Sequence, residues 1–125
     1  MIFSRCQWNE KAAEKILPLV YGRLKNNFVK DIKSGHFALW RVHDKSFETW
    51  LVTSMAHLDS GHIELVVECI AGKKSREIMT ELIRRSKKLG VTSVRFESIH
   101  NEKLVQRMSL SNGFGRVGTV FRVEI

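Results

Sequence analysis

The sequence contains only two cysteines, one proline and one tyrosine in 125 residues, and it has no long apolar run. Cys6 and Cys69 lie far apart and outside any CxxC or Cys/His pattern, so we expect neither a disulfide framework nor a zinc site. The histidines are scattered without HxxxH spacing, and we expect no bound metal. No segment approaches the roughly 18 apolar residues of a membrane span, and the N-terminus lacks a secretory pattern. These absences predict a cytoplasmic protein that does not contact a membrane.

Acidic residues are in the minority. The chain has 21 Lys and Arg against 13 Asp and Glu, a net charge of +8, and the excess is larger in residues 63–125 than in residues 1–62. A basic surface attracts polyanions or phosphorylated ligands. The same charge fits equally well a surface that only keeps the protein in solution.

The first half of the chain reads as strands and a broken helix. Nothing marks a linker, so we predict a single domain, residues 1–125. IFSRCQ alternates like a short strand, and Asn9 is placed to cap a helical pattern that Pro18 interrupts. HFALWRVHD and SFETWLVTSMAHL, separated by residues 44–46, predict an antiparallel hairpin.

The second half alternates strands and helices. HIELVVECI predicts a strand, and helical spacing runs from Ser75 until Gly90 ends it. VTSVRFESI predicts another strand, Asn101 begins a short helix to about Leu110, and GTVFRVEI is the final strand. We therefore predict a mixed α/β sheet covered by helices, with a parallel crossover between the strands at 62–70 and 91–99.

The junction CIAGKKSREIMTELI, residues 69–83, runs from an apolar strand straight into an amphipathic helix. A helix start presents unpaired N–H groups and the positive end of its dipole, which suit a phosphate. Gly72 permits a tight turn or a close backbone approach. The residues that follow add three positive charges and a hydroxyl: Lys73, Lys74, Arg76 and Ser75. The pattern predicts an anion-binding turn; an ordinary strand-to-helix turn with a solvated basic start is the alternative.

Three features of residues 62–114 resemble the GNAT (N-acetyltransferase) superfamily. They are the strand ELVVECI before the glycine-lysine turn and helix, the Gly90-Val91 entry to the next strand, and Asn101 followed by Asn112-Gly113-Phe114. The resemblance implies a GNAT-like acyl-CoA N-acyltransferase fold, with a mostly antiparallel sheet, a parallel β-α-β crossover and helices on both faces. It also implies acetyl transfer from acetyl-CoA to an amine of a small molecule or protein.

In that family the loop after the fourth strand and the start of the next helix bind the pyrophosphate of acetyl-CoA. The family pattern is Gln/Arg-x-x-Gly-x-Gly/Ala, whereas this sequence has Gly72 in the first position and Ser75-Arg76-Glu77 in the last three. Backbone N–H groups near Cys69 and Ile70 would hold the thioester oxygen, and the Cys69 thiol itself is expected to be inert. The implied cofactor-binding residues are Cys69, Ile70, Gly72, Lys73, Lys74, Ser75, Arg76 and Asn101.

Transfer to an amine needs a base, and an acid for the leaving thiolate. Glu64 resembles the strand glutamate that serves as base in the histone-acetyltransferase branch. Glu64 and Glu68 share one face of the strand, where two carboxylates could raise one another's proton affinity. The alternative is that these acids pair with Arg or Lys of adjacent strands. Ser109 stands where many family members have a tyrosine, so Ser109 or a water would supply the proton to the thiolate.

Two other functions stay open. Small catalytically inactive GNAT-like proteins occur in tailed bacteriophages, and a phage origin would place this chain in the host cytoplasm or the virion as a binding or structural protein. A basic nucleic-acid-binding module would use six residues on phosphates: Lys73, Lys74, Arg84, Arg85, Lys87 and Lys88. A homodimer paired through the C-terminal strand TVFRVEI is a further open alternative.

Overall fold

The computed structural model describes the backbone of residues 1–20, 24–97, 115–117 and 120–125. These residues form two units: Met1–Ser54 with Glu68–Lys74, and Met55–Val67 with Ser75–Ile125. Hydrogen bonds join the strands in the order β1-β2-β3-β4-β5-β7-β6. Strands β3 and β4 contribute residues to both units, and the other strands each belong to one.

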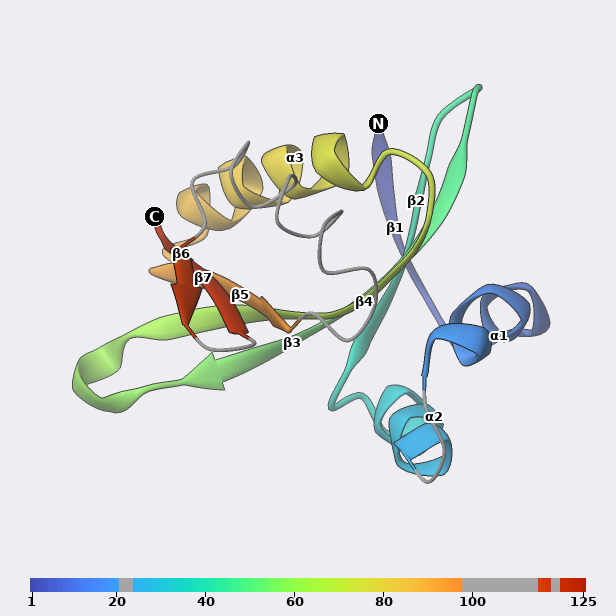
Figure 1. The fold of residues 1–125 in the computed structure, drawn as a ribbon, viewed down its shortest axis with the longest axis horizontal. Helices are drawn as coiled ribbons and strands as arrows, with labels where there is room; N and C mark the ends of the chain where they lie inside the picture. The colour runs from blue at the N-terminus through green and yellow to red at the C-terminus, as the bar shows by residue number, and fades with distance from the viewer. Residues whose placement is uncertain (21–23, 98–114, 118–119) are drawn as a thin grey trace. The chain divides into compact units, whose positions relative to one another are not determined.

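The first unit is an antiparallel sheet with two helices and a short 3₁₀ turn. Its complete elements are β1 (Ile2–Cys6), α1 (Glu10–Ile16), η1 (Leu17–Leu19), α2 (Leu24–Ser34) and β2 (Ala38–His43). Strand β1 pairs with β2, and β2 pairs with β3 (Glu48–His57), both antiparallel (Figure 1). Between β2 and β3, the Asp44 carboxylate accepts hydrogen bonds from the N–H and hydroxyl of Ser46, both at 2.7 Å. The predicted strand and hairpin are thereby confirmed.

The helical region of the first unit also follows its sequence signals. Asn9 caps α1, since its side-chain oxygen accepts a hydrogen bond from the backbone N–H of Ala12 at 3.0 Å. Pro18 lies in η1, where α1 has ended, so the predicted interruption is confirmed. Both helices contribute to one apolar core with the strands: Ala12, Ile16, Ile32, Leu39, Trp50, Val52 and Ala71.

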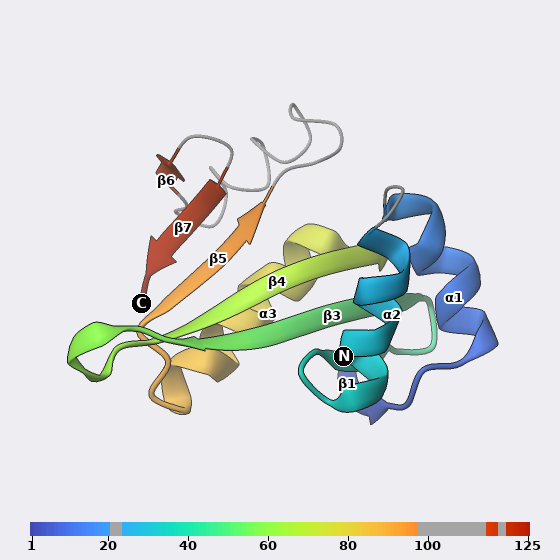
Figure 2. The same cartoon turned by 90° about the horizontal axis from the view of Figure 1, so that it is seen from below.

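The second unit contains the predicted crossover. Strand β4 (Ile63–Gly72) pairs in parallel with β5 (Ser93–Glu97), and α3 (Ser75–Lys88) connects them. Strand β5 pairs antiparallel with β7 (Val120–Glu124), which pairs antiparallel with β6 (Gly115–Val117). Helix α3 lies over one face of β5 and the adjoining part of β4 (Figures 1 and 2), and it buries Ile78, Met79 and Leu82.

Two details of this unit go beyond the sequence patterns. The short strand β6 has no counterpart in the predicted element order, because its three residues, which begin with Gly115, are too few to show a periodicity. After β3 the chain forms a short 3₁₀ turn, η2 (Asp59–Gly61), in which Ser60 has a left-handed φ of 69°. The predicted helix from Asn101 to about Leu110 lies outside the described residues. None of the helices described here has the length and apolar character needed to cross a bilayer.

Candidate functional site

The turn after β4 is fixed by Thr49 of β3. Gly72 has a φ of 140°, and a Cβ at this position would lie 2.6 Å from Thr49 Oγ1 and 3.0 Å from Thr49 Cα. The buried Thr49 hydroxyl also donates a hydrogen bond to the Lys73 carbonyl at 2.5 Å. The predicted close backbone approach at Gly72 is confirmed, and the backbone that it approaches is that of β3.

The next residues carry the chain into helix α3. Lys74 has a left-handed φ of 67°, which residues other than glycine rarely adopt, and Ser75 is the first helical residue. Lys73, Lys74 and Arg76 are all exposed. Thus the residues predicted to bind phosphate run from the end of β4 at Gly72, through Lys73 and Lys74, into the first turn of α3 at Ser75 and Arg76, and the cationic side chains are open to solvent.

Cys69 and Ile70 lie on β4 before the turn and are half-buried. The Cys69 side chain packs against the apolar core of the first unit. Burial raises the pKa of its thiol to about 12, so the thiol stays protonated at neutral pH. This agrees with the expectation of an inert thiol, and only the backbone of Cys69 is suited to contact a ligand.

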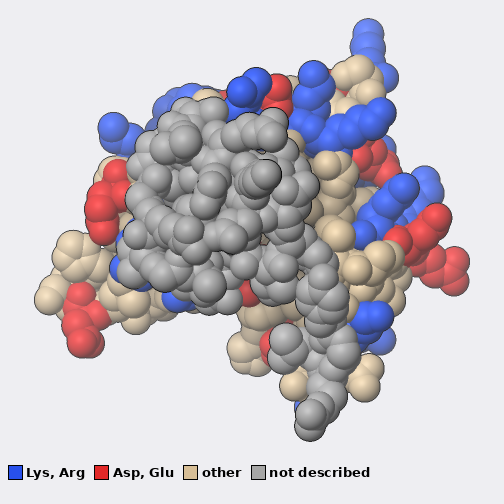
Figure 3. All heavy atoms as spheres, viewed as in Figure 1, with Lys and Arg blue, Asp and Glu red and all other residues tan. Residues whose placement is uncertain are grey.

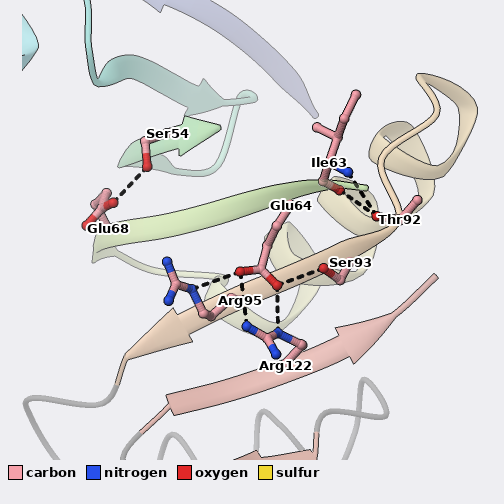
Figure 4. Close-up of polar contacts among 8 residues, drawn as sticks. All are labelled: Ser54, Ile63, Glu64, Glu68, Thr92, Ser93, Arg95 and Arg122. Atoms are coloured by element: carbon pink, nitrogen blue, oxygen red, sulfur yellow. Dashed lines mark hydrogen bonds and ion pairs between the residues drawn. The ribbon is translucent and has the colours of Figure 1, made fainter. Parts of the chain in front are cut away.

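The Glu64 carboxylate is the most enclosed charged group among the described residues, with 1% of the side chain exposed. Ser93 of β5 donates a hydrogen bond to its Oε2 at 2.7 Å. Arg122 of β7 places Nε 2.6 Å from Oε2 and Nη2 3.3 Å from Oε1, and Arg95 of β5 places Nε 3.1 Å from Oε1 (Figure 4). One carboxylate is therefore shared by two guanidinium groups.

These contacts decide the protonation of Glu64. Burial would raise its pKa, but the hydrogen bonds from Ser93 and Arg122 and the charges of Arg122 and Arg95 outweigh burial and lower the pKa below the ordinary 4.5. The prediction that Glu68 would raise the proton affinity of Glu64 is therefore wrong, because the charged groups that shift the Glu64 pKa are arginines. The predicted alternative, that this acid pairs with arginines of neighbouring strands, is confirmed for Glu64.

Of the other predicted catalytic residues, only Glu68 lies within the described part of the chain. Glu68, in the first unit, accepts a hydrogen bond from the Ser54 hydroxyl at 2.8 Å (Figure 4). Ser109, predicted as the acid, and Asn101, predicted to bind the cofactor, lie outside the described residues. The sequence interpretation missed Thr49, Ser93, Arg95 and Arg122, although the alternation in VRF and FRV places both arginines on the polar sides of their strands.

The lowered pKa of Glu64 makes stability depend on pH. Because the folded-state pKa lies below 4.5, the carboxylate stabilises the folded protein above that value, and this stabilisation is lost as pH falls through the folded-state pKa. Urea unfolding should show that the free energy of unfolding falls less between neutral pH and about pH 3 in Glu64→Gln than in the unchanged protein. Equal losses in the two proteins would contradict the ion-paired state of Glu64.

The geometry of the crossover and its turn can be compared with solved structures. No protein-family model matches the chain, and no curated protein sequence matches it significantly. A Bacillus subtilis acetyltransferase in complex with CoA is similar, with a TM-score of 0.73 and 10% identity over 98% of this chain and 97% of that one. The chain has the GNAT fold. The predicted resemblance is confirmed at this level.

Two further structures share the GNAT fold. Arabidopsis thaliana NAA60 in complex with a bisubstrate analogue has a TM-score of 0.65 and 13% identity, over 99% of this chain and 98% of that one. A GNAT-family acetyltransferase from Listeria monocytogenes has a TM-score of 0.55 and 13% identity, over 79% of this chain and 70% of that one. At these identities the likeness establishes the fold, and the chemistry has to be argued from the residues of this chain.

Proposed function

We propose that the protein is an N-acetyltransferase that transfers an acetyl group from acetyl-CoA to an amine. The observation that carries this proposal is the turn between β4 and α3. In a chain with the GNAT fold, this turn is held in place by Thr49 and leads into a helix start with three exposed cations: Lys73, Lys74 and Arg76. Two of the solved structures with this fold hold CoA and a bisubstrate analogue.

The turn suits a pyrophosphate for local reasons. The first N–H groups of α3 have no partner within the helix and lie at the positive end of its dipole. Lys73 and Lys74 add charge from residues that precede the helix, while Glu77 in the first turn subtracts from it. On the face shown in Figure 3, Lys and Arg side chains are interspersed with acidic ones. Binding of the pyrophosphate would therefore depend on the turn before α3 and not on a broad basic surface.

The chemical step transfers the acetyl carbon from sulfur to nitrogen. The amine nitrogen attacks the thioester carbon, the C–S bond breaks, and the CoA thiolate takes up a proton. The attacking ammonium must first lose a proton. Glu64 is a weak base at its lowered pKa, so we assign that proton to water and give Glu64 a role in holding Arg95 and Arg122. Ser109 stays proposed as the acid for the thiolate.

A second candidate is a GNAT-fold protein that binds an acyl-CoA or another ligand without transfer. The engagement of Glu64 by two arginines favours it, because the carboxylate predicted as base is already committed. Ser75 and Glu77, at positions where the family pattern has glycines or alanine, favour it as well.

Calorimetric titration with acetyl-CoA, with desulfo-CoA and ADP as comparison ligands, tests the proposal. We expect saturable binding, weakened about tenfold by Lys73→Glu, because a reversed charge beside a pyrophosphate changes the binding free energy by about 1.4 kcal/mol or more. The exposed Lys30 on α2 gives a matched control, and Lys30→Glu should bind like the unchanged protein. Absence of binding would contradict the proposed transferase and restrict the second candidate to a ligand other than acetyl-CoA. Binding without transfer to any amine would favour the second candidate.

A further inference from the structure

Arg95 and Arg122 face each other across two neighbouring strands. Their Cα atoms are register partners in the antiparallel pair β5 and β7. Like charges directly opposite in a sheet repel and destabilise the pair. Here Glu64 lies between the guanidinium groups and compensates one of the two charges (Figure 4). The formal charges of these three residues sum to +1, and Glu124 follows two residues after Arg122 on the same face of β7.

Within the described residues, the cluster also has hydrogen-bond donors that no acceptor satisfies. Each guanidinium has five N–H groups, whereas one carboxylate offers about four acceptor positions, and Ser93 occupies one of them. Both Nε atoms are buried and lie near Glu64, yet neither N–H is aligned for a hydrogen bond. Within the described residues, Arg122 donates a hydrogen bond to Glu64 through Nη2, and Arg95 contacts Glu64 through Nε.

Both arginine side chains are partly exposed. The side chains of Arg95 and Arg122 are 30% and 37% exposed, while Glu64 beneath them is 1% exposed. The buried carboxylate thus holds two arginine side chains that are partly open to solvent, and because both Nε atoms are buried, the exposed surface belongs to the other atoms of these side chains. Paired guanidinium groups with planar N–H donors are suited to the oxygens of carboxylates and phosphates.

We propose that Arg95 and Arg122 bind an oxyanion of the acceptor, a carboxylate or a phosphate group, and that Glu64 is the positioning residue that holds them. The inference rests on the proposed function in naming the acceptor as the source of the oxyanion. It narrows the acceptor class to amines that also carry an acidic group.

Phosphate affinity in a Glu64 variant distinguishes the proposed anion site from an ion pair that only joins strands. Glu64→Gln keeps the size of the side chain and raises the charge of the cluster from +1 to +2, counted from two arginines and one carboxylate. We expect Glu64→Gln to bind inorganic phosphate severalfold more tightly than the unchanged protein, although its fold is less stable. An unchanged phosphate affinity would overturn the proposal, because Glu64 would then neither hold the arginines for an anion nor offset their charge at a binding site. Weaker binding would show that its hold on the arginines outweighs its charge.

The direct experiment follows the arginine Nε–H signals by NMR during titration with inorganic phosphate or acetate at constant ionic strength. We expect the signals of Arg95 and Arg122 to shift together and saturably, and Arg122→Gln to weaken binding at least tenfold. Arg84→Gln is the matched control, because Arg84 also pairs with a glutamate but lies on the surface of α3. Arg122→Lys, which keeps the charge and removes the second donor arm, should fall between the two.

The outcomes separate this inference from the proposed function. Absence of a saturable shift at Arg95 and Arg122, or equal weakening by Arg84→Gln, would overturn the oxyanion site. Displacement of phosphate from these signals by CoA would overturn its assignment to the acceptor. Because the titration needs no cofactor, failure of acetyl-CoA binding with an intact phosphate response would contradict the proposed function and leave the binding site standing. A stronger response to acetate than to phosphate would identify the acceptor group as a carboxylate, and the reverse as a phosphate.

Discussion

Glu64→Gln is expected to lower the free energy of unfolding by about 2–4 kcal/mol, because it removes the only charge shown between two guanidinium groups that face each other. Glutamine still accepts the hydrogen bond from Ser93, so the loss comes mainly from the charge. The estimate lies at or below the usual cost of breaking a buried pair, since both arginines reach water. Urea unfolding at neutral pH, followed by circular dichroism, measures the change.

Glu81 provides the matched control for this prediction. It also bridges two arginines, Arg84 and Arg85, but at the surface of helix α3, where water replaces lost contacts. Glu81→Gln should therefore destabilise the protein far less than Glu64→Gln. Similar losses in the two variants would show that burial of the Glu64 cluster contributes nothing to stability. A typical domain has enough stability to stay folded after the expected loss.

Gly72→Ala is expected to destabilise the protein by about 2–4 kcal/mol and to weaken any ligand held by the turn. The added methyl group would lie 2.6 Å from Thr49 Oγ1, 3.0 Å from Thr49 Cα and 3.1 Å from the Glu48 carbonyl oxygen. Two of these atoms belong to the backbone of β3 and cannot rotate away. Thermal and urea unfolding measure the loss, and calorimetry with acetyl-CoA measures its effect on the turn.

Two further variants separate the contact from backbone strain. Gly35 also has a positive φ, 88°, but a Cβ there would meet nothing within 4 Å, so Gly35→Ala should cost only about 1 kcal/mol. Thr49→Ala in the Gly72→Ala background removes the hydroxyl but not the backbone contacts, and it should restore little stability. Equal effects at Gly35 and Gly72 would refute a special approach of the turn to β3.

Local patterns in the sequence were sufficient for most elements of the fold. The side chain of Asn9, the interruption at Pro18 and the alternation on either side of residues 44–46 each act over a few residues, and each has the predicted consequence. The parallel crossover followed from the change of period at Ser75. Strand β6 escaped prediction because its three residues acquire their structure by pairing with β7.

The candidate site was predictable only where it is continuous in sequence. The turn from Gly72 to Arg76 could be recognised because glycine, lysines and helix start are adjacent. The partners of Glu64 could not, since Ser93 and Arg122 are separated from it by 29 and 58 positions. Their contact depends on the register of three strands, which alternation in a single strand does not specify. The same register places two arginines beside Glu64, so the pKa of Glu64 is lowered, whereas its sequence context predicted a raised pKa.

The opposition of Arg95 and Arg122 has a consequence for how the chain finds its native pairing. If β7 slipped by one residue along β5, Arg122 would turn to the other side of the sheet, and Val123 would replace it beside Glu64. That misaligned form would leave the buried carboxylate with fewer counter-charges and carry a guanidinium into apolar surroundings. The three charged residues therefore add an electrostatic contribution that favours the observed alignment of the last strand over one shifted by a residue.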